Sequence, residues 1–209
     1  MSCPGGHPAG LSLGRDMAAF ASMLNAIDRT AECRWDLIRV VLGTYIHWAS
    51  EPTEQSLARL VPLMTQAAQY AELAGVELAI ETHCDLPSRT IRELIEQVGS
   101  DHVGIVLDTA NVIRIGEDLL EAARLVAPYT RMLHVKDLDL SQADIGDPGG
   151  WWPCVTLGKG DLPLADCLTN LMRNGRVDLA CIEISAVHPT ANEDDMIASS
   201  LEWLSAFLP

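Results

Sequence analysis

The sequence is poor in basic residues. Its 14 lysines and arginines stand against 29 aspartates and glutamates, which gives a formal net charge of −15 and a pI near 4.6. A surface this acidic repels phosphate backbones and anionic lipids. We therefore expect a small-molecule partner, and neither nucleic acid nor a membrane.

Several sequence signals are missing as well. The six cysteines show no CxxC spacing, the first residues show no charged-then-apolar signal pattern, and no apolar run approaches the ~18 residues that span a bilayer. We expect a reduced, cytoplasmic protein. No GxGxxG or GxxxxGK[ST] motif follows an apolar run, which disfavours an open sheet with a glycine-rich nucleotide-binding turn.

The length and the apolar content fit one domain. With 209 residues, of which 48% are hydrophobic, the chain can bury a sizeable core. We expect a single domain over residues 1–209. The early Cys-Pro-Gly-Gly-His-Pro segment is typical of a loop, so residues 1–14 are expected to be a loop or a loose N-terminus.

Short apolar runs alternate with amphipathic segments. The runs expected to be strands cover about residues 37–42, 76–81, 103–108, 130–136 and 178–184, with 11–13 as a candidate for an earlier one. The segments expected to be helices cover about residues 16–34, 53–74, 87–98, 117–126, 164–174 and 192–207. Thr53 can cap the second helix and Gly75 can end it. This alternation predicts parallel strands covered by helices on both faces.

Four side chains that can bind a metal lie at or near the ends of successive apolar runs. Glu81 closes Val-Glu-Leu-Ala-Ile-Glu, Asp108 closes Val-Gly-Ile-Val-Leu-Asp, His134 lies in Leu-His-Val-Lys-Asp, and Glu183 lies in Cys-Ile-Glu-Ile. Such groups are costly to bury unless they are paired or metal-bound, so their common placement favours one shared divalent cation. Because functional residues gather at the carboxyl ends of barrel strands, we predict a TIM barrel over a doubly wound sheet.

Five fragments also carry a family resemblance. Ala-Ile-Glu-Thr-His, Val-Leu-Asp-Thr-Ala-Asn, Leu-His-Val-Lys-Asp, Leu-Gly-Lys-Gly-Asp and Cys-Ile-Glu-Ile, in this order within residues 15–207, resemble the xylose-isomerase-like sugar phosphate isomerase/epimerase family. The resemblance implies a TIM barrel whose metal ligands are Glu81, Asp108, His134 and Glu183. It also implies that the two glutamates act both as ligands and as acid and base.

The chain departs from this family at its front. About six βα units fit, and the first two of the barrel have no counterpart, whereas a complete barrel takes ~250 residues. A fragment, a late start and a protomer that closes its barrel in an unusual way all remain open. Missing strands expose sheet edges that need cover, so we also expect a homo-oligomer.

The ligand set suits Mn²⁺, Mg²⁺, Co²⁺ or Zn²⁺, and octahedral geometry would leave two positions for substrate oxygens. A keto-sugar held there can lose the proton beside its carbonyl and pass through an enediolate. Glu81 and Glu183 can remove and return that proton, which is isomerisation or epimerisation. Two alternatives stay open: a metal-dependent sugar-acid dehydratase or decarboxylase on the same barrel, and a non-catalytic truncated barrel that binds a sugar or another protein.

Two polar residues near the ligands are candidates for substrate binding. Lys136 stands two positions after His134, so it should point to the same side of the strand. It could instead pair with Asp137 or Asp108. Asn111, one helical turn beyond Asp108, stands where the resembling epimerases often have a histidine, and a helix cap is its favoured alternative role.

Further candidates for substrate binding lie in the expected loops. His83 follows Glu81 by two residues and is equally suited to a solvent-exposed loop position. Tyr45 and His47 have the polar tips and flat faces of a sugar pocket, or they pack over the barrel top. Trp152 lies in an irregular stretch over about residues 139–153 whose length is typical of a lid. As part of a tryptophan pair, it could instead form an oligomer contact.

Overall fold

The computed structural model describes residues 11–189 and 191–207. The chain divides into two compact units, Met1–Val106 and Leu107–Pro209. One strand, β3 (Val103–Asp108), begins in the first unit and ends in the second.

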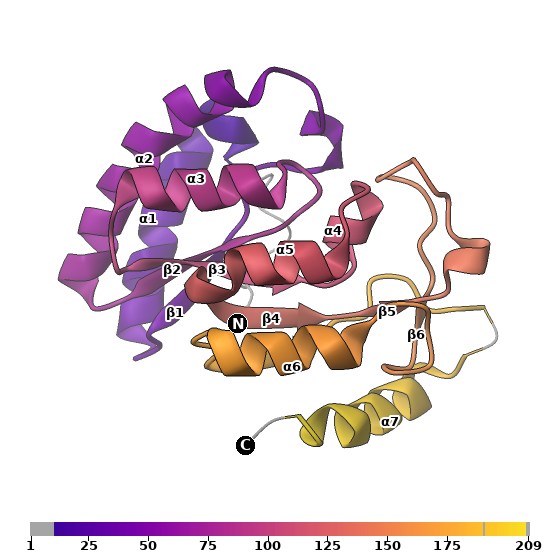
Figure 1. Ribbon diagram of the computed structural model, residues 1–209. Coiled ribbons are helices and arrows are strands. Elements are labelled where there is room, and N and C mark those ends of the chain that lie inside the picture. The colour runs from indigo at the N-terminus through magenta and orange to yellow at the C-terminus, as the bar shows by residue number, and fades with distance from the viewer. Residues whose placement is uncertain (1–10, 190, 208–209) are drawn as a thin grey trace. The chain divides into compact units, whose positions relative to one another are not determined.

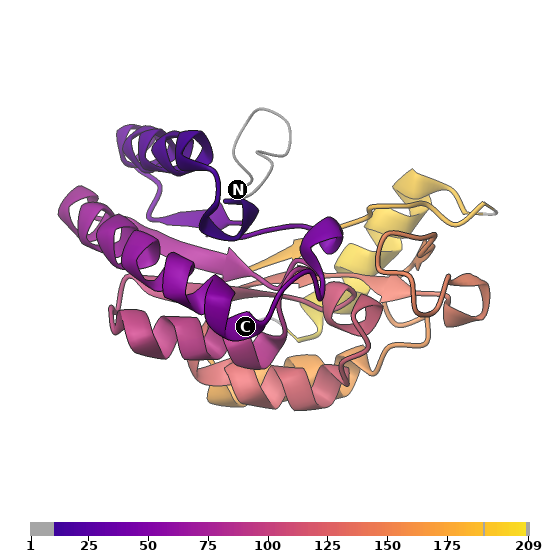
Figure 2. The ribbon, with the colours of Figure 1, turned by 90° about the horizontal axis from the view of Figure 1, so that it is seen from above.

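The first unit alternates helices and parallel strands (Figure 1). Its elements are α1 (Met17–Glu32), β1 (Leu37–Val40), the 3-10 helix η2 (Tyr45–His47), α2 (Thr53–Ala74), β2 (Glu77–Glu81) and α3 (Ser88–Val98). β2 pairs in parallel with β1 and β3, with Arg39 opposite Ala79 and Glu81 opposite Val106. Helix α2 lies beside α1 and α3 (Figure 2). This arrangement brings the carboxyl ends of the strands to one edge of the sheet.

Local sequence explains where α2 begins and ends. Gly75 ends it in the left-handed conformation with φ at +69°, which costs glycine no steric clash. Its buried side chains recur every three or four residues, as in Leu60, Met64, Ala67 and Ala71. The expectation that Thr53 caps this helix is wrong. Pro52 holds the cap position and makes no side-chain cap, so Thr53 is the first helical residue.

The candidate strand over residues 11–13 does not form. The structure has instead a 3-10 helix, η1 (Ser12–Gly14), in which Leu13 has a φ of +53°. The Leu13 amide still donates to the Leu42 carbonyl at 2.9 Å, so the segment follows the chain beyond β1 without extending. A left-handed backbone cannot continue a strand, which is why apolar composition alone misled here. Residues 1–10, part of the expected loose N-terminus, lie outside the described residues.

The second unit continues the same alternation. Its elements are α4 (Asn111–Arg114), α5 (Leu119–Val126), η3 (Ala127–Tyr129), β4 (Thr130–Val135), β5 (Asp137–Leu138), η4 (Leu140–Gln142), β6 (Cys154–Val155), α6 (Leu164–Asn174), β7 (Leu179–Ile182) and α7 (Glu193–Ser205). β7 pairs in parallel with β4, with His134 opposite Cys181, and β5 pairs with β6 in a short antiparallel ladder. Helices α5 and α6 pack against each other.

The parallel strands are the five expected runs at 37–42, 76–81, 103–108, 130–136 and 178–184. The run at 103–108 keeps its full length, and the others are one to three residues shorter. Every residue of β3 and β4 is buried, which explains the apolar run Val-Gly-Ile-Val-Leu in β3. Within residues 11–189 and 191–207, no helix combines the length and apolar character that a membrane crossing needs.

Candidate metal centre

The second unit brings three metal-ligand side chains together. Asp108 is the last residue of β3, His134 lies in β4, and Glu183 directly follows β7. His134 Nδ1 lies 2.6 Å from Glu183 Oε2 and 4.0 Å from Asp108 Oδ2. One ligand atom from each residue lies within 4.8 Å of the others. Two carboxylates and an imidazole at this spacing could hold a single divalent ion.

The Asp108 carboxylate is fixed by the chain that follows it. Its Oδ1 accepts the backbone amides of Ala110 and Asn111, both at 2.9 Å, and the residue is fully buried. Oδ1 is thus committed to the turn that starts α4. Oδ2 is the oxygen that faces His134 and the rest of the cluster.

Lys136 completes the cluster with a positive charge. Its Nζ lies 2.8 Å from Asp108 Oδ2 and 3.0 Å from Glu183 Oε1, and the residue is 3% exposed. Of the two pairings considered from the sequence, the structure contains the one with Asp108. Burial lowers the pKa of Lys136, but the charges of Asp108 and Glu183 raise it more, so the ammonium form is favoured.

The same contacts act on Glu183. Burial raises the pKa of its carboxyl, but the hydrogen bond with His134 and the charge of Lys136 outweigh this and hold the pKa well below its usual range. Glu183 is therefore ionised at neutral pH. An ionised carboxylate is the form that binds a metal.

Backbone contacts hold Lys136 in place. The Thr109 hydroxyl donates to the Lys136 carbonyl at 2.7 Å and accepts the Lys136 amide at 2.9 Å. The next residue, Asp137, accepts the amides of Gly158 and Gly160, both at 2.9 Å, and of Leu138 and Leu162. Burial raises the pKa of Asp137 against the opposing effect of these amides. The Leu-Gly-Lys-Gly-Asp turn thus wraps around the carboxylate beside the cluster, a role that the sequence analysis missed.

Two other predicted substrate-binding residues lie in this unit. Asn111 is 2% exposed and is the first residue of α4, where its Oδ1 is 3.4 Å from Arg114 Nη1. The favoured capping role is wrong, because the Asp108 carboxylate accepts the amides there. Trp152 is 4% exposed, and its indole N–H donates to the Asp147 carbonyl at 2.9 Å. This hydrogen bond joins Trp152 to another part of the 139–153 loop.

The remaining candidates lie in the first unit. Glu81 ends β2, is 1% exposed, and forms an ion pair with Arg39 of β1. His83 Nδ1 is 3.2 Å from the Gly43 carbonyl. Sequence reasoning missed Arg39, although a single basic residue within the apolar run Leu-Ile-Arg-Val-Val is a signal that could have identified it.

Tyr45 and His47 belong to η2 in the same unit. Tyr45 is 50% exposed, so its side chain is accessible to a ligand. His47 Nδ1 accepts the Thr44 amide at 3.0 Å, so this imidazole helps to fix its own turn.

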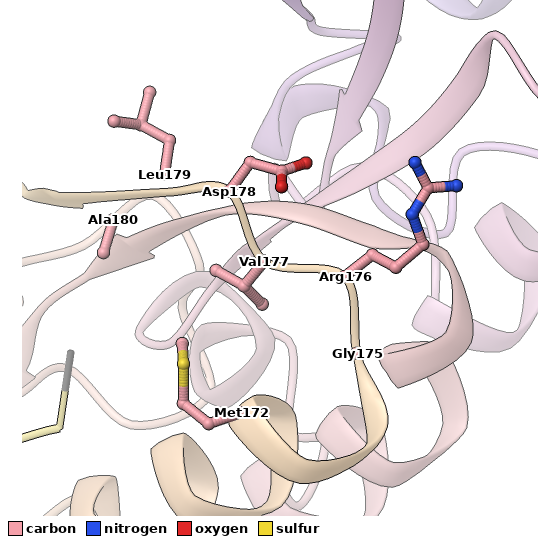
Figure 3. A pocket seen from close by; sticks show the side chains of 7 residues that line it. All are labelled: Met172, Gly175, Arg176, Val177, Asp178, Leu179 and Ala180. Carbon is pink, nitrogen blue, oxygen red and sulfur yellow. The ribbon is translucent and has the colours of Figure 1, made fainter. Parts of the chain in front are cut away.

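An open pocket of about 540 Å³ lies elsewhere in the second unit (Figure 3). It is lined by Met172 at the end of α6 and by residues 175–180, which lead into β7. Glu183 follows the opposite end of that strand. In barrels of this type the amino ends of strands serve stability and the carboxyl ends serve function, so this pocket is not the candidate site.

Parallel strands followed by helices, with carboxylates and an imidazole at their carboxyl ends, define the class of (β/α)-barrel proteins with a metal-type site. The family model described as xylose isomerase-like TIM barrel matches residues 1–207. The chain belongs to this family. The family expected from the five sequence fragments is therefore confirmed.

Individual proteins are similar to parts of the chain. The uncharacterized protein YihM of Escherichia coli (strain K12) is 30% identical over 101 residues, which are 47% of this chain and 29% of YihM. The 2-epi-5-epi-valiolone 7-phosphate 2-epimerase of Actinoplanes sp. (strain ATCC 31044 / CBS 674.73 / SE50/110) is 32% identical over 117 residues, which are 56% of this chain and 39% of the epimerase. The chain thus matches less than half the length of either relative.

A solved structure matches over more of its length. The xylose isomerase domain protein from Planctomyces limnophilus is 27% identical, with a TM-score of 0.73, and the match covers 95% of this chain and 68% of that one. The barrel architecture expected from the sequence is shared with this protein.

Proposed function

We propose that the chain acts as a divalent-metal-dependent isomerase or epimerase of a small keto-sugar or sugar derivative. The observation that carries the proposal is the convergence of Asp108, His134 and Glu183 at the ends of their strands. Membership of the xylose isomerase-like family and the similarity to an epimerase of a 7-phosphate support it.

We further propose that Glu81 is the fourth metal ligand. It is a buried carboxylate at the end of β2, and it stands opposite Val106 on β3, the strand that ends at Asp108. Three carboxylates and one imidazole suit Mn²⁺, Mg²⁺, Co²⁺ or Zn²⁺. When bound, such an ion would polarise the substrate carbonyl and make the neighbouring C–H acidic.

The protein side chains would then move the proton. Glu183, an ionised carboxylate directly after β7, is suited to take a proton from the carbon beside the carbonyl, and Glu81 to return one at the other side. Return to the same carbon from the opposite face inverts its configuration, and return to the neighbouring carbon shifts the carbonyl. Lys136, Asn111, His83, Tyr45 and His47 are the proposed substrate contacts, while Trp152 would hold the 139–153 loop.

Metal content and hydrogen exchange together test this function. Elemental analysis and titration calorimetry should find one divalent ion per chain, and Glu183→Gln should weaken its binding by roughly 100-fold. Glu96→Gln is the matched control, because Glu96 is an exposed carboxylate that forms an ion pair with Arg92 in α3. A ketose that exchanges its α-hydrogen with deuterated solvent in the wild type, but not in Glu183→Gln, would identify the substrate class. A folded wild-type protein that binds no divalent ion would refute the proposal.

We also propose that the protein is a homo-oligomer. Among residues 11–189 and 191–207, β7 is an edge strand of the parallel sheet, because it pairs with β4 on one side and with no further strand of that sheet on the other. Leu179 on β7 is 44% exposed. An uncovered strand edge with exposed apolar residues favours association. Light scattering coupled to size exclusion should give a mass above 22.7 kDa, and a monomer at all concentrations would contradict this.

A further inference from the structure

The sequence has only two lysines, and they have opposite environments. Lys136 is 3% exposed within the carboxylate cluster, whereas Lys159 is exposed in the turn that wraps around Asp137. In an acidic protein with few cations, one of the two lysines is therefore buried at the candidate metal centre. Its ammonium contacts two of the residues that would bind the metal.

In this geometry the Lys136 ammonium and a metal ion would compete for the same oxygen atom of Asp108. Asp108 Oδ1 is already occupied by the amides of Ala110 and Asn111. Oδ2 is left for a cation, and Lys136 Nζ lies 2.8 Å from it. A divalent ion binds a carboxylate oxygen at ~2.1 Å, so an ion on Oδ2 would lie within ~5 Å of the ammonium. Two cations at that distance repel each other strongly in a buried site.

We propose that Lys136 is the resident cation of this centre, which competes with the divalent ion for Asp108 and Glu183 and leaves both carboxylates when the ion binds. The inference rests on the proposed metal-dependent function. In the metal-free protein the ammonium contacts both carboxylates and reduces the repulsion between them, so the protein can fold before it acquires an ion. After displacement, the ammonium is available to a substrate oxygen.

If Lys136 has this role, its removal should change the stability of the metal-free protein and the affinity for the ion in opposite directions. A lysine that only stabilised the fold would not have this effect. Without Lys136 the metal-free protein keeps the buried Asp108 carboxylate and the partly exposed Glu183 carboxylate without this cation, so it should unfold at lower temperature. The metal, however, no longer has to displace a resident charge. Lys136→Met should therefore lower the Tm of the metal-free protein and increase the affinity for the ion.

The test is calorimetric titration of the metal-free full chain with Mn²⁺, alongside thermal unfolding with and without Mn²⁺. Lys136→Met should bind Mn²⁺ at least tenfold more tightly than wild type and show the larger rise in Tm on addition of the ion. Lys136→Arg keeps the charge and should stay near wild type. Lys159→Met removes an equal charge from an exposed position and should change the affinity less than twofold.

The possible failures are distinguishable. If wild type binds Mn²⁺ and Lys136→Met binds it equally or more weakly, the competition is refuted while the metal centre stands. If neither protein binds Mn²⁺, the proposed function fails and this inference fails with it. If Lys136→Met folds only in the presence of Mn²⁺, its affinity is measured by competition with a chelator, and the same tenfold criterion applies.

Discussion

Arg39 forms an ion pair with Glu81 across the neighbouring strands β1 and β2. Arg39 stands opposite Ala79, two residues before Glu81, so both side chains lie on the same face of the sheet. Glu81 is 1% exposed, and a carboxylate this buried needs a cation. Arg39 supplies one within the first unit.

We expect Arg39→Met to destabilise the metal-free protein by about 3 kcal/mol, because it leaves the buried Glu81 carboxylate without this partner. Urea unfolding followed by circular dichroism measures the loss. Arg39→Lys, which keeps the charge, should recover part of it. In the double variant with Glu81→Gln the two losses should overlap, so fully additive losses would show that the pair is not coupled.

Gly160 packs directly against Asp137. A Cβ at this position would lie 2.3 Å from Asp137 Oδ1 and 2.5 Å from the Leu138 carbonyl. We expect Gly160→Ala to destabilise the fold by about 2–3 kcal/mol, because the turn must move away from the carboxylate that its amides surround. Thermal unfolding tests this, with Lys159→Ala in the same turn as the control. A change below ~0.5 kcal/mol would mean that the turn adjusts freely.

Glu51 should make the stability depend on pH. Burial raises the pKa of its carboxyl, but hydrogen bonds from Ser56, Arg15 and Arg59 lower it to about 2, below the usual 4.5. Because the folded pKa lies below the unfolded one, the stabilisation is present above about pH 4.5 and is lost as the pH falls toward 2.

At pH 7 we therefore expect Glu51→Gln to be less stable than wild type by about 1–2 kcal/mol, a figure reduced for the partial exposure of the two arginines. The difference should shrink at pH 3. Urea unfolding at both values measures it, and a difference that stays constant would contradict the lowered pKa. Glu96→Gln, which removes an exposed ion pair with Arg92, should show less than ~0.5 kcal/mol at either pH.

The adjacent tryptophans should respond differently to substitution. Trp152 is buried and donates to the Asp147 carbonyl, whereas Trp151 is 43% exposed. We expect Trp152→Ala to cost about 3–4 kcal/mol and Trp151→Ala less than ~1 kcal/mol. Denaturant unfolding followed by far-UV circular dichroism compares the two. Equal losses would show that the 139–153 loop is not anchored by Trp152.

Much of the fold could be predicted from the sequence because its signals are local. The apolar runs at 103–108 and 130–136 become fully buried strands, and Gly75 ends α2 as expected. The run at 11–13 does not form a strand, because Leu13 has a left-handed backbone; its amide and carbonyl bond to Leu42 and Arg59, which lie far along the chain. The prediction that Thr53 caps α2 was wrong because a capping-type residue locates the start of a helix only to within about two residues.

The sequence by itself determined the alternation of helices and strands and the placement of ligand-type residues at strand ends, since both depend on spacing along the chain. Only the tertiary structure decided which atoms meet. It commits Asp108 Oδ1 to backbone amides, leaves Oδ2 to Lys136, and joins His134 to Glu183. These partners come from different strands, and their distances depend on register and side-chain direction, which spacing in the sequence does not contain.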